Sequence, residues 1–187
     1  MLNLFFPNLC RGCHNELLGN DKEMLKIFYG RVPVENATAL FYFRKNGLTQ
    51  KFVHALKYRG AEKLGYIFGA WLGEELSDSK AYKDIDAVIP VPLHKKKFKQ
   101  RGFNQVAGFG KEIASALDVP YIDDVLMKIT PTKSQVFKEK FSRIFSQEEV
   151  FICQNIEKIN GKHLLLVDDI ITSGATLEAC SSKLLKA

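Results

Sequence analysis

The sequence predicts one α/β domain with a central, mainly parallel sheet flanked by helices. Short apolar segments alternate with amphipathic ones along the 187 residues. Strands separated by helices pair in parallel through right-handed crossovers. A chain of this length can bury a sizeable core, and its 46% hydrophobic and 26% charged residues are ordinary for a globular protein.

Hydrophobic periodicity, and the residues that interrupt it, place the individual elements. In helix 62–76 the apolar residues recur once per turn, and strand 85–91 is stopped by Pro92. The expected strands cover residues 37–43, 85–91, 125–129, 150–153 and 163–167. The expected helices cover residues 49–58, 62–76, 104–117 and 177–185.

Composition excludes a membrane-spanning protein. No apolar run approaches the roughly 20 residues that cross a bilayer, and residues 1–7 lack the basic and small-residue signals of a secretory leader. We therefore expect a cytoplasmic protein, in which cysteines do not form a disulfide framework. Cys153 and Cys180 lie in apolar surroundings and are expected to be inert core residues.

The most informative segment, 164–176, is an apolar strand that runs into two carboxylates, a glycine turn and a helix. Asp168 and Asp169 follow the strand directly, where ligands bind in open α/β sheets. The turn at 172–176 opens the next helix, so its free N–H groups favour an anion, and Gly174 lets the backbone approach a phosphate. The carboxylates would repel a phosphate but suit hydroxyls or a hydrated metal ion. A place for two hydroxyls beside a place for a phosphate indicates a site for a ribose 5-phosphate. A buried strand ending in an acidic helix cap explains the paired acids and the turn less well.

Two basic blocks, 94–101 and 128–143, stand out in a chain of net charge +6. Each is either a solvated loop or a site for a polyanion, pyrophosphate or nucleic acid. Phenylalanines are interleaved with these lysines, as in surfaces that bind single-stranded DNA by stacking. Anchoring of a solvated loop in the core would explain the same aromatic residues.

Cys10 and Cys13 form the one Cys-x-x-Cys motif of the chain. A structural zinc site takes about four ligands, so this motif supplies half of one. A flexible thiol pair or a zinc half-site is therefore favoured over a complete intramolecular zinc site.

Segment 164–176 resembles the phosphoribosyl-diphosphate (PRPP) binding loop of the type I phosphoribosyltransferases, in which four apolar residues, two acids and two apolar residues precede a Thr/Ser-Gly-x-Thr turn. The runs Ala-Leu-Lys-Tyr-Arg-Gly at 55–60 and Gln-Arg-Gly-Phe-Asn-Gln at 100–105 resemble hallmarks of the ComF family of competence and DNA-uptake proteins. Residues 6–13 are similar to the start of the ComF zinc finger. The resemblance covers nearly the whole chain.

This resemblance implies the type I phosphoribosyltransferase fold, with residues 1–30 as a small cysteine-containing hood segment and 31–187 as the phosphoribosyltransferase-like domain. Three departures from the family accompany it. The second Cys-x-x-Cys motif is absent, the flexible loop reads Arg-Ile-Phe-Ser-Gln from residue 143, and the chain stops inside the helix after the PRPP loop. We therefore expect the usual last strand to be lacking.

The resemblance also implies a chemistry in which Mg²⁺ bridges the pyrophosphate and ribose hydroxyls of PRPP. A strained or cis peptide is expected near residues 93–94, because related pyrophosphate loops turn their N–H groups inward in this way. The residues expected to carry catalysis are Asp168, Asp169, Lys133 and Arg143. The residues expected to bind PRPP are Thr172, Ser173, Gly174, Ala175, Thr176, Leu93, His94, Lys95 and Arg101.

Two classes of function remain open from the sequence. The chain is either an enzyme that transfers a phosphoribosyl group to an amine or base, or a competence protein that binds single-stranded DNA and uses PRPP as a regulatory ligand. The family resemblance implies helicase-type competence proteins as partners in the second case.

Overall fold

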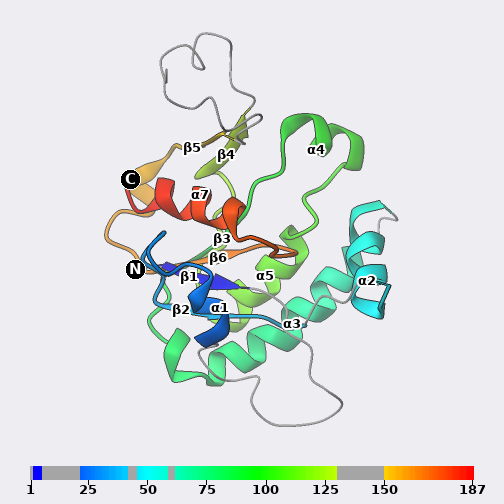
Figure 1. Cartoon of the computed structure of the whole chain (residues 1–187), viewed down its shortest axis with the longest axis horizontal. Coiled ribbons are helices and arrows are strands. Elements are labelled where there is room, and N and C mark those ends of the chain that lie inside the picture. Colours follow the sequence, from blue (N-terminus) through cyan, green and yellow to red (C-terminus); the bar gives the residue numbers. More distant parts are fainter. Residues whose placement is uncertain (1, 6–21, 42–45, 59–61, 130–149) are drawn as a thin grey trace.

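The computed structural model of the chain describes residues 2–5, 22–41, 46–58, 62–129 and 150–187. Its central sheet has four parallel strands in the order β2-β1-β6-β3 (Figure 1). A separate antiparallel pair joins β4 to β5. The strands are β1 (Leu2–Phe5), β2 (Asn36–Thr38), β3 (Ala87–Pro90), β4 (Leu126–Ile129), β5 (Val150–Cys153) and β6 (Leu164–Val167).

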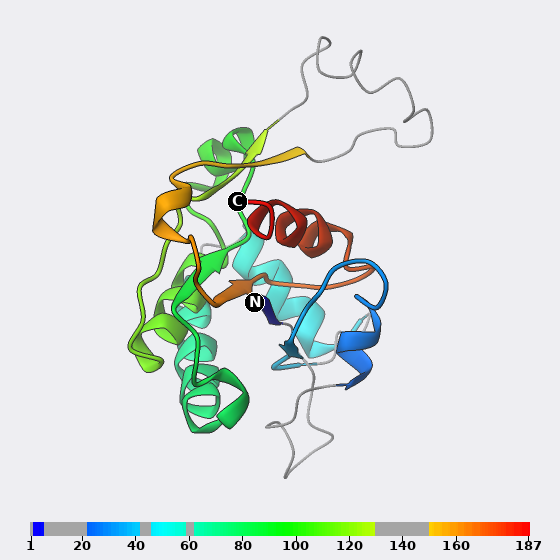
Figure 2. The same cartoon turned by 90° about the vertical axis from the view of Figure 1, so that its left-hand side faces the viewer.

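Helices lie on both faces of the central sheet (Figure 2). One face is covered by α3 (Glu62–Asp78) and α5 (Ala107–Ala116), and the other by α1 (Lys22–Lys26) and α7 (Ala175–Leu184). The remaining helices are α2 (Leu48–Tyr58), α4 (Lys95–Arg101) and two short 3₁₀ turns, Lys80–Tyr82 and Ile156–Lys158. The predicted α/β fold, with a parallel sheet flanked by helices, is confirmed.

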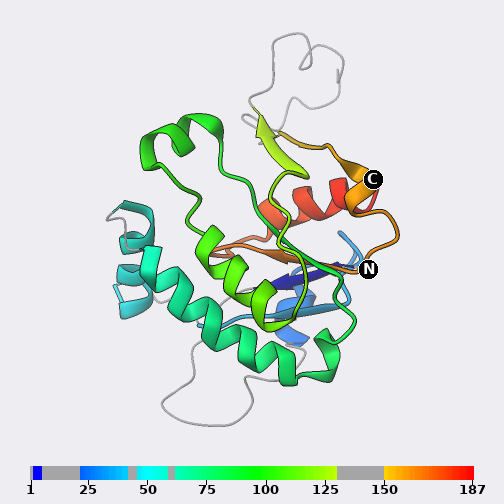
Figure 3. The ribbon, with the colours of Figure 1, turned by 180° about the vertical axis from the view of Figure 1, so that it is seen from behind.

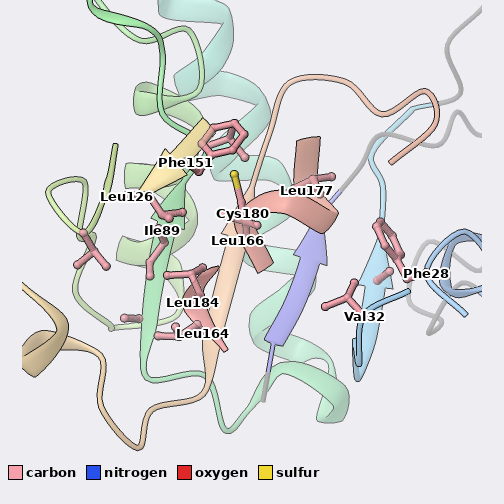
Figure 4. Packing of buried hydrophobic residues seen from close by; sticks show 14 of the residues in the cluster. Phe28, Val32, Ile89, Leu126, Phe151, Leu164, Leu166, Leu177, Cys180 and Leu184 are labelled. Atoms are coloured by element: carbon pink, nitrogen blue, oxygen red, sulfur yellow. The ribbon is translucent and has the colours of Figure 1, made fainter. Parts of the chain in front are cut away.

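Strand β6 supplies side chains to two hydrophobic clusters, because successive residues of a strand point to opposite faces. Leu164 and Leu166 pack with residues of α1 and α7, including the fully buried Cys180 (Figure 4). Leu165 and Val167 pack on the other face with residues of α3 and α5. All four β6 side chains are buried, which confirms the prediction of a strand that is apolar on both faces.

Helix α3 packs closely on α5 through a stripe of glycines spaced four residues apart. At Gly69 an added Cβ would lie 2.4 Å from the backbone oxygen of Phe109. At Gly73 it would lie 2.6 Å from Cβ of Ala116. The glycines therefore set the separation of the two helices, and with it the thickness of this layer.

Two predicted elements differ from the structure. Strand 37–43 is shorter, because β2 ends at Thr38 and the ring of Phe41 leaves the sheet to pack edge-on against Phe68, with ring centroids 5.1 Å apart. The basic block at 94–101 contains a helix, α4, which ends at Gly102 in a left-handed conformation with a φ of 83°. That block has no apolar face, so periodicity could not reveal the helix.

The described parts of residues 1–30 share the sheet and core of the rest of the chain. Strand β1 lies between β2 and β6, and Phe28, just after α1, is buried against the α7 layer. The boundary at residue 30 stays a prediction. Cys10 and Cys13 lie outside the described residues.

Replacing Gly69 with Ala should lower the free energy of unfolding by about 1–3 kcal/mol, the usual cost of over-packing. The clash is with the backbone of α5, which cannot move without shifting the helix. Gly108→Ala is the matched control, because its Cβ would meet, at 2.9 Å, the exposed and rotatable ring of Tyr66. We expect the control to change stability by less than about 1 kcal/mol. Urea denaturation compares the two variants, and an equal loss in both would contradict the close helix contact.

Candidate functional site

The carboxyl ends of β3 and β6 lie side by side at one edge of the sheet. Pro90 pairs with Val167 in parallel register, and the N–H of Val91 donates to the carbonyl of Val167 over 2.8 Å. The turn after β3 and the acidic pair after β6 therefore leave the sheet together. This is the position that the sequence predicted for a ligand crevice.

The acidic pair is shielded from water. The side chain of Asp169 is 7% exposed, and its backbone N–H donates to Oδ1 of Asp168 over 2.8 Å. Burial raises the pKa of Asp168 well above its usual range, because the charged form loses its hydration, and the neighbouring charge of Asp169 raises it further. The pair therefore resists carrying two negative charges.

Lys57, which sequence reasoning did not assign to the site, contacts this pair from α2. Its Nζ lies 2.8 Å from Oδ2 of Asp169. That oxygen is buried and accepts no well-aligned hydrogen bond within the described residues, so the contact is an ion pair. Lys57 belongs to the run at 55–60 that resembles the ComF family, but nothing in the run itself indicates which residue it contacts.

The turn after the acidic pair carries the predicted phosphate-binding residues. Thr172, Ser173 and Ala175 are exposed, and α7 begins at Ala175. Gly174 has a φ of 76°, a left-handed conformation that favours glycine. A Cβ there would lie 2.7 Å from Ile27, so Gly174 also lets the turn pack on the segment after α1.

Arg31 ties this turn to the amino-terminal part of the chain and was also missed from the sequence. Its Nη1 donates to the carbonyl of Ser173 over 2.8 Å and to that of Ile27 over 3.0 Å. Its Nη2 forms an ion pair with Glu178 in the first turn of α7. Arg31 also lines an open hollow of about 410 Å³, together with Leu25 and the other residues of 28–34. Arg31 thus fixes the turn from a segment that is distant in sequence.

The turn after β3 does not have the geometry predicted for it. The peptides of residues 93–96 are trans, and His94 has an ordinary extended conformation with a φ of −60°. The prediction of a strained or cis peptide is therefore wrong. The reason is that α4 begins here: Nδ1 of His94 accepts the N–H of Lys96 over 3.1 Å and caps the helix.

The predicted PRPP-binding residues on α4 lie at its two ends. Leu93, His94 and the exposed Lys95 stand near the acidic edge, because they follow β3 directly. Arg101 lies six residues further, about 9 Å along the helix, and its Nη1 donates to Oε1 of Gln105 over 2.8 Å. A contact between Arg101 and PRPP stays a prediction.

Several predicted site residues lie outside the part of the chain that the structure describes: Lys133, Arg143, Cys10 and Cys13. Among the described residues, no group of three or more His, Cys, Asp or Glu side chains could hold a metal ion. Two carboxylates nevertheless fit Mg²⁺, which proteins bind through one or two carboxylates together with substrate phosphates. No helix in the described ranges is long and apolar enough to cross a membrane.

Residues 107–187, from α5 to the end of the chain, match the family model of the phosphoribosyl transferase domain. The parallel sheet, with its acidic pair and glycine turn, is therefore a phosphoribosyltransferase-type domain. Together with the competence proteins to which it is similar, this places the chain in the ComF family. No solved structure matches the chain significantly.

Three relatives illustrate this similarity. The competence protein ComFC of Streptococcus pneumoniae (strain ATCC BAA-255 / R6) is 31% identical over 72% of this chain and 56% of its own length. ComFC of Bacillus subtilis (strain 168) is 30% identical over 75% of this chain and 55% of its own length. The DNA utilization protein YhgH of Escherichia coli (strain K12) is 22% identical over 72% of this chain and 60% of its own length. The chain thus spans little more than half the length of these relatives.

Asp168→Asn should raise the melting temperature at neutral pH. Below about pH 4 the carboxyl is protonated in both the folded and the unfolded chain. As the pH rises towards the raised folded-state pKa, the unfolded chain releases its proton first, so the wild-type protein loses stability. Asparagine has no such proton, and its Oδ1 can still accept the N–H of Asp169.

Thermal unfolding between about pH 4 and pH 8 measures this difference. The advantage of the variant over the wild type should grow as the pH rises. A difference that stays constant with pH would show that burial of the Asp168 carboxylate does not destabilise the fold.

Proposed function

We propose that the chain binds PRPP with a divalent cation and transfers its phosphoribosyl group to a nitrogen nucleophile, an amine or a base. The observation that carries this proposal is the half-buried pair Asp168–Asp169, which stands directly before the glycine turn at 172–176. Both leave the sheet at the edge that they share with the turn after β3. A phosphate, two hydroxyls and a pyrophosphate thus have separate places along one edge.

Each group of the ligand is assigned to residues of matching chemistry. Asp168 and Asp169 would accept the 2- and 3-hydroxyls of the ribose and, through water, would hold Mg²⁺. The N–H groups at the start of α7 and the hydroxyls of Thr172, Ser173 and Thr176 bind the 5-phosphate. The turn at 93–95 faces the pyrophosphate, and Lys133 and Arg143 close over it.

The reaction separates charge, which this site is built to stabilise. Cleavage at the anomeric carbon leaves positive charge on the ribose and negative charge on the departing pyrophosphate. Mg²⁺ supplies the positive charge that stabilises the leaving group. The carboxylates of Asp168 and Asp169 oppose the charge on the ribose, while Lys95 and the fixed N–H donors oppose that on the pyrophosphate.

We place this activity in the cytoplasm. A chain whose cysteines serve the core suits a reducing compartment, where disulfide frameworks are rare. Cys180 is fully buried and Cys153 packs against the same cluster, so both serve the core.

The double variant Asp168→Asn with Asp169→Asn should lose at least about a hundredfold in affinity for PRPP and Mg²⁺, since each charged hydrogen bond contributes about 1.5–3 kcal/mol. Asp123→Asn with Asp124→Asn is the matched control. It removes two carboxylates that are also consecutive in sequence but lie on another loop, before β4. Isothermal titration calorimetry of the three proteins measures the affinities. Unchanged affinity in the first variant would remove Asp168 and Asp169 from the site.

A second function, binding of single-stranded DNA during competence with helicase-type partners, is favoured by helix α4. The helix has no buried residue and stands apart from the central sheet (Figure 3). Its lysines are exposed and flank Phe98 in sequence, and Phe98 is 48% exposed. Exposed lysines around an aromatic ring suit a phosphate backbone with a base stacked on the ring. In this case PRPP acts as a regulatory ligand.

If α4 binds DNA, affinity for a single strand should fall steeply with salt, with a slope of about −0.7 per phosphate contact. Charge-neutralising substitutions at Lys95, Lys96, Lys97 and Lys99 should flatten that slope by about three units. PRPP should compete, because its pyrophosphate would occupy the adjacent turn. Fluorescence anisotropy across a salt series measures both effects, and a slope that the substitutions leave unchanged would exclude α4 as the DNA surface.

A further inference from the structure

The ammonium of Lys57 stands where a cation bound by the acidic pair would stand. Its Nζ is 2.8 Å from Oδ2 of Asp169, and that side chain is 7% exposed. The same oxygen is buried and has no well-aligned hydrogen bond within the described residues. It therefore depends on a positive charge from another segment of the chain, and Lys57 on α2 supplies it.

Such a contact changes what the carboxylates can attract. The ammonium neutralises one negative charge, and it lies 2.8 Å from the oxygen that a divalent ion would use. A second positive ion at the pair meets the repulsion of this fixed charge, which is strong because the site is largely shielded from water. The acidic pair therefore has a low affinity for free Mg²⁺ while Lys57 remains in place.

The lysine is nevertheless free to leave. Its side chain is 23% exposed and is four methylenes long, so its head can swing towards solvent or towards an anion. A polyanionic ligand that brings a divalent ion offers the ammonium a new partner and offers Asp169 a new cation. One movement then satisfies both charges.

We propose that Lys57 is a resident counter-ion that restricts the acidic pair to divalent cations arriving together with a polyanion. This rests on the proposed function only for the identity of that polyanion, PRPP. In the empty site Lys57 holds Asp169. In the loaded site the divalent ion replaces it, and the ammonium pairs with a phosphate oxygen of the ligand.

Binding of Mn²⁺, a paramagnetic substitute for Mg²⁺, tests this without any measurement of activity. Electron paramagnetic resonance reports free Mn²⁺ in the presence of the protein alone. Lys57→Gln should bind the ion at least about tenfold more tightly than the wild type, because the repelling charge is gone. Lys57→Arg should behave as the wild type, because it retains the charge.

The matched control is Lys51→Gln, which removes an equal charge from an exposed position of the same helix. It should leave Mn²⁺ binding unchanged. Circular dichroism and thermal unfolding establish that each variant is folded. Equal Mn²⁺ affinity in Lys57→Gln and the wild type, or an equal gain in Lys51→Gln, would overturn the proposal.

A second titration separates this inference from the proposed function. With PRPP present, the wild type should take up Mn²⁺ that it binds only weakly alone, beyond the amount that PRPP holds in a protein-free mixture, and Lys57→Gln should show much less dependence on PRPP. If PRPP brings no Mn²⁺ to either protein, the proposed ligand is wrong. The comparison of Mn²⁺ affinities without PRPP still decides whether Lys57 weakens cation binding at the acidic pair.

Discussion

The parallel pairing of β3 with β6 is the interaction on which the site depends. The bond from the N–H of Val91 to the carbonyl of Val167 aligns the last residues of two strands that are far apart in sequence. Both strands are buried on both faces, so a shift of register would move side chains of different size into each other's places in two packed clusters. The residues that follow Pro90 and Val167 therefore leave the sheet at one edge. A register shift of one residue would displace the two halves of the site by about 3.3 Å along the strands.

Charge at this edge is balanced within the protein. Asp168 resists ionisation, Asp169 is paired with Lys57, and Arg31 is paired with Glu178 beside the glycine turn. These groups together carry little net charge, so they favour a ligand that brings charges of both signs. A metal–polyphosphate complex has that property, whereas a bare cation or a bare anion does not.

The local features of the site could be predicted from the sequence, and the distant contacts could not. Strand β6, the acidic pair and the turn at Gly174 lie in one continuous segment, so their order alone places them at a crevice. Lys57 and Arg31 reach the same place from remote segments, and no local pattern indicates their partners. Helix α4 was missed for another reason: it buries nothing, and only the left-handed Gly102 at its end could have indicated a helix.

The contact between Arg31 and Ser173 also bears on how the protein acquires its shape. These residues are 142 positions apart, and the guanidinium holds the turn that opens α7. Contacts over such a span close a large loop, which slows folding and leaves apolar surface uncovered in the meantime. A ribosome that has made only the first half of the chain carries no part of the glycine turn. The edge of the sheet at which β3 and β6 end is therefore completed late in folding. A ligand that binds there would stabilise the whole fold rather than one loop.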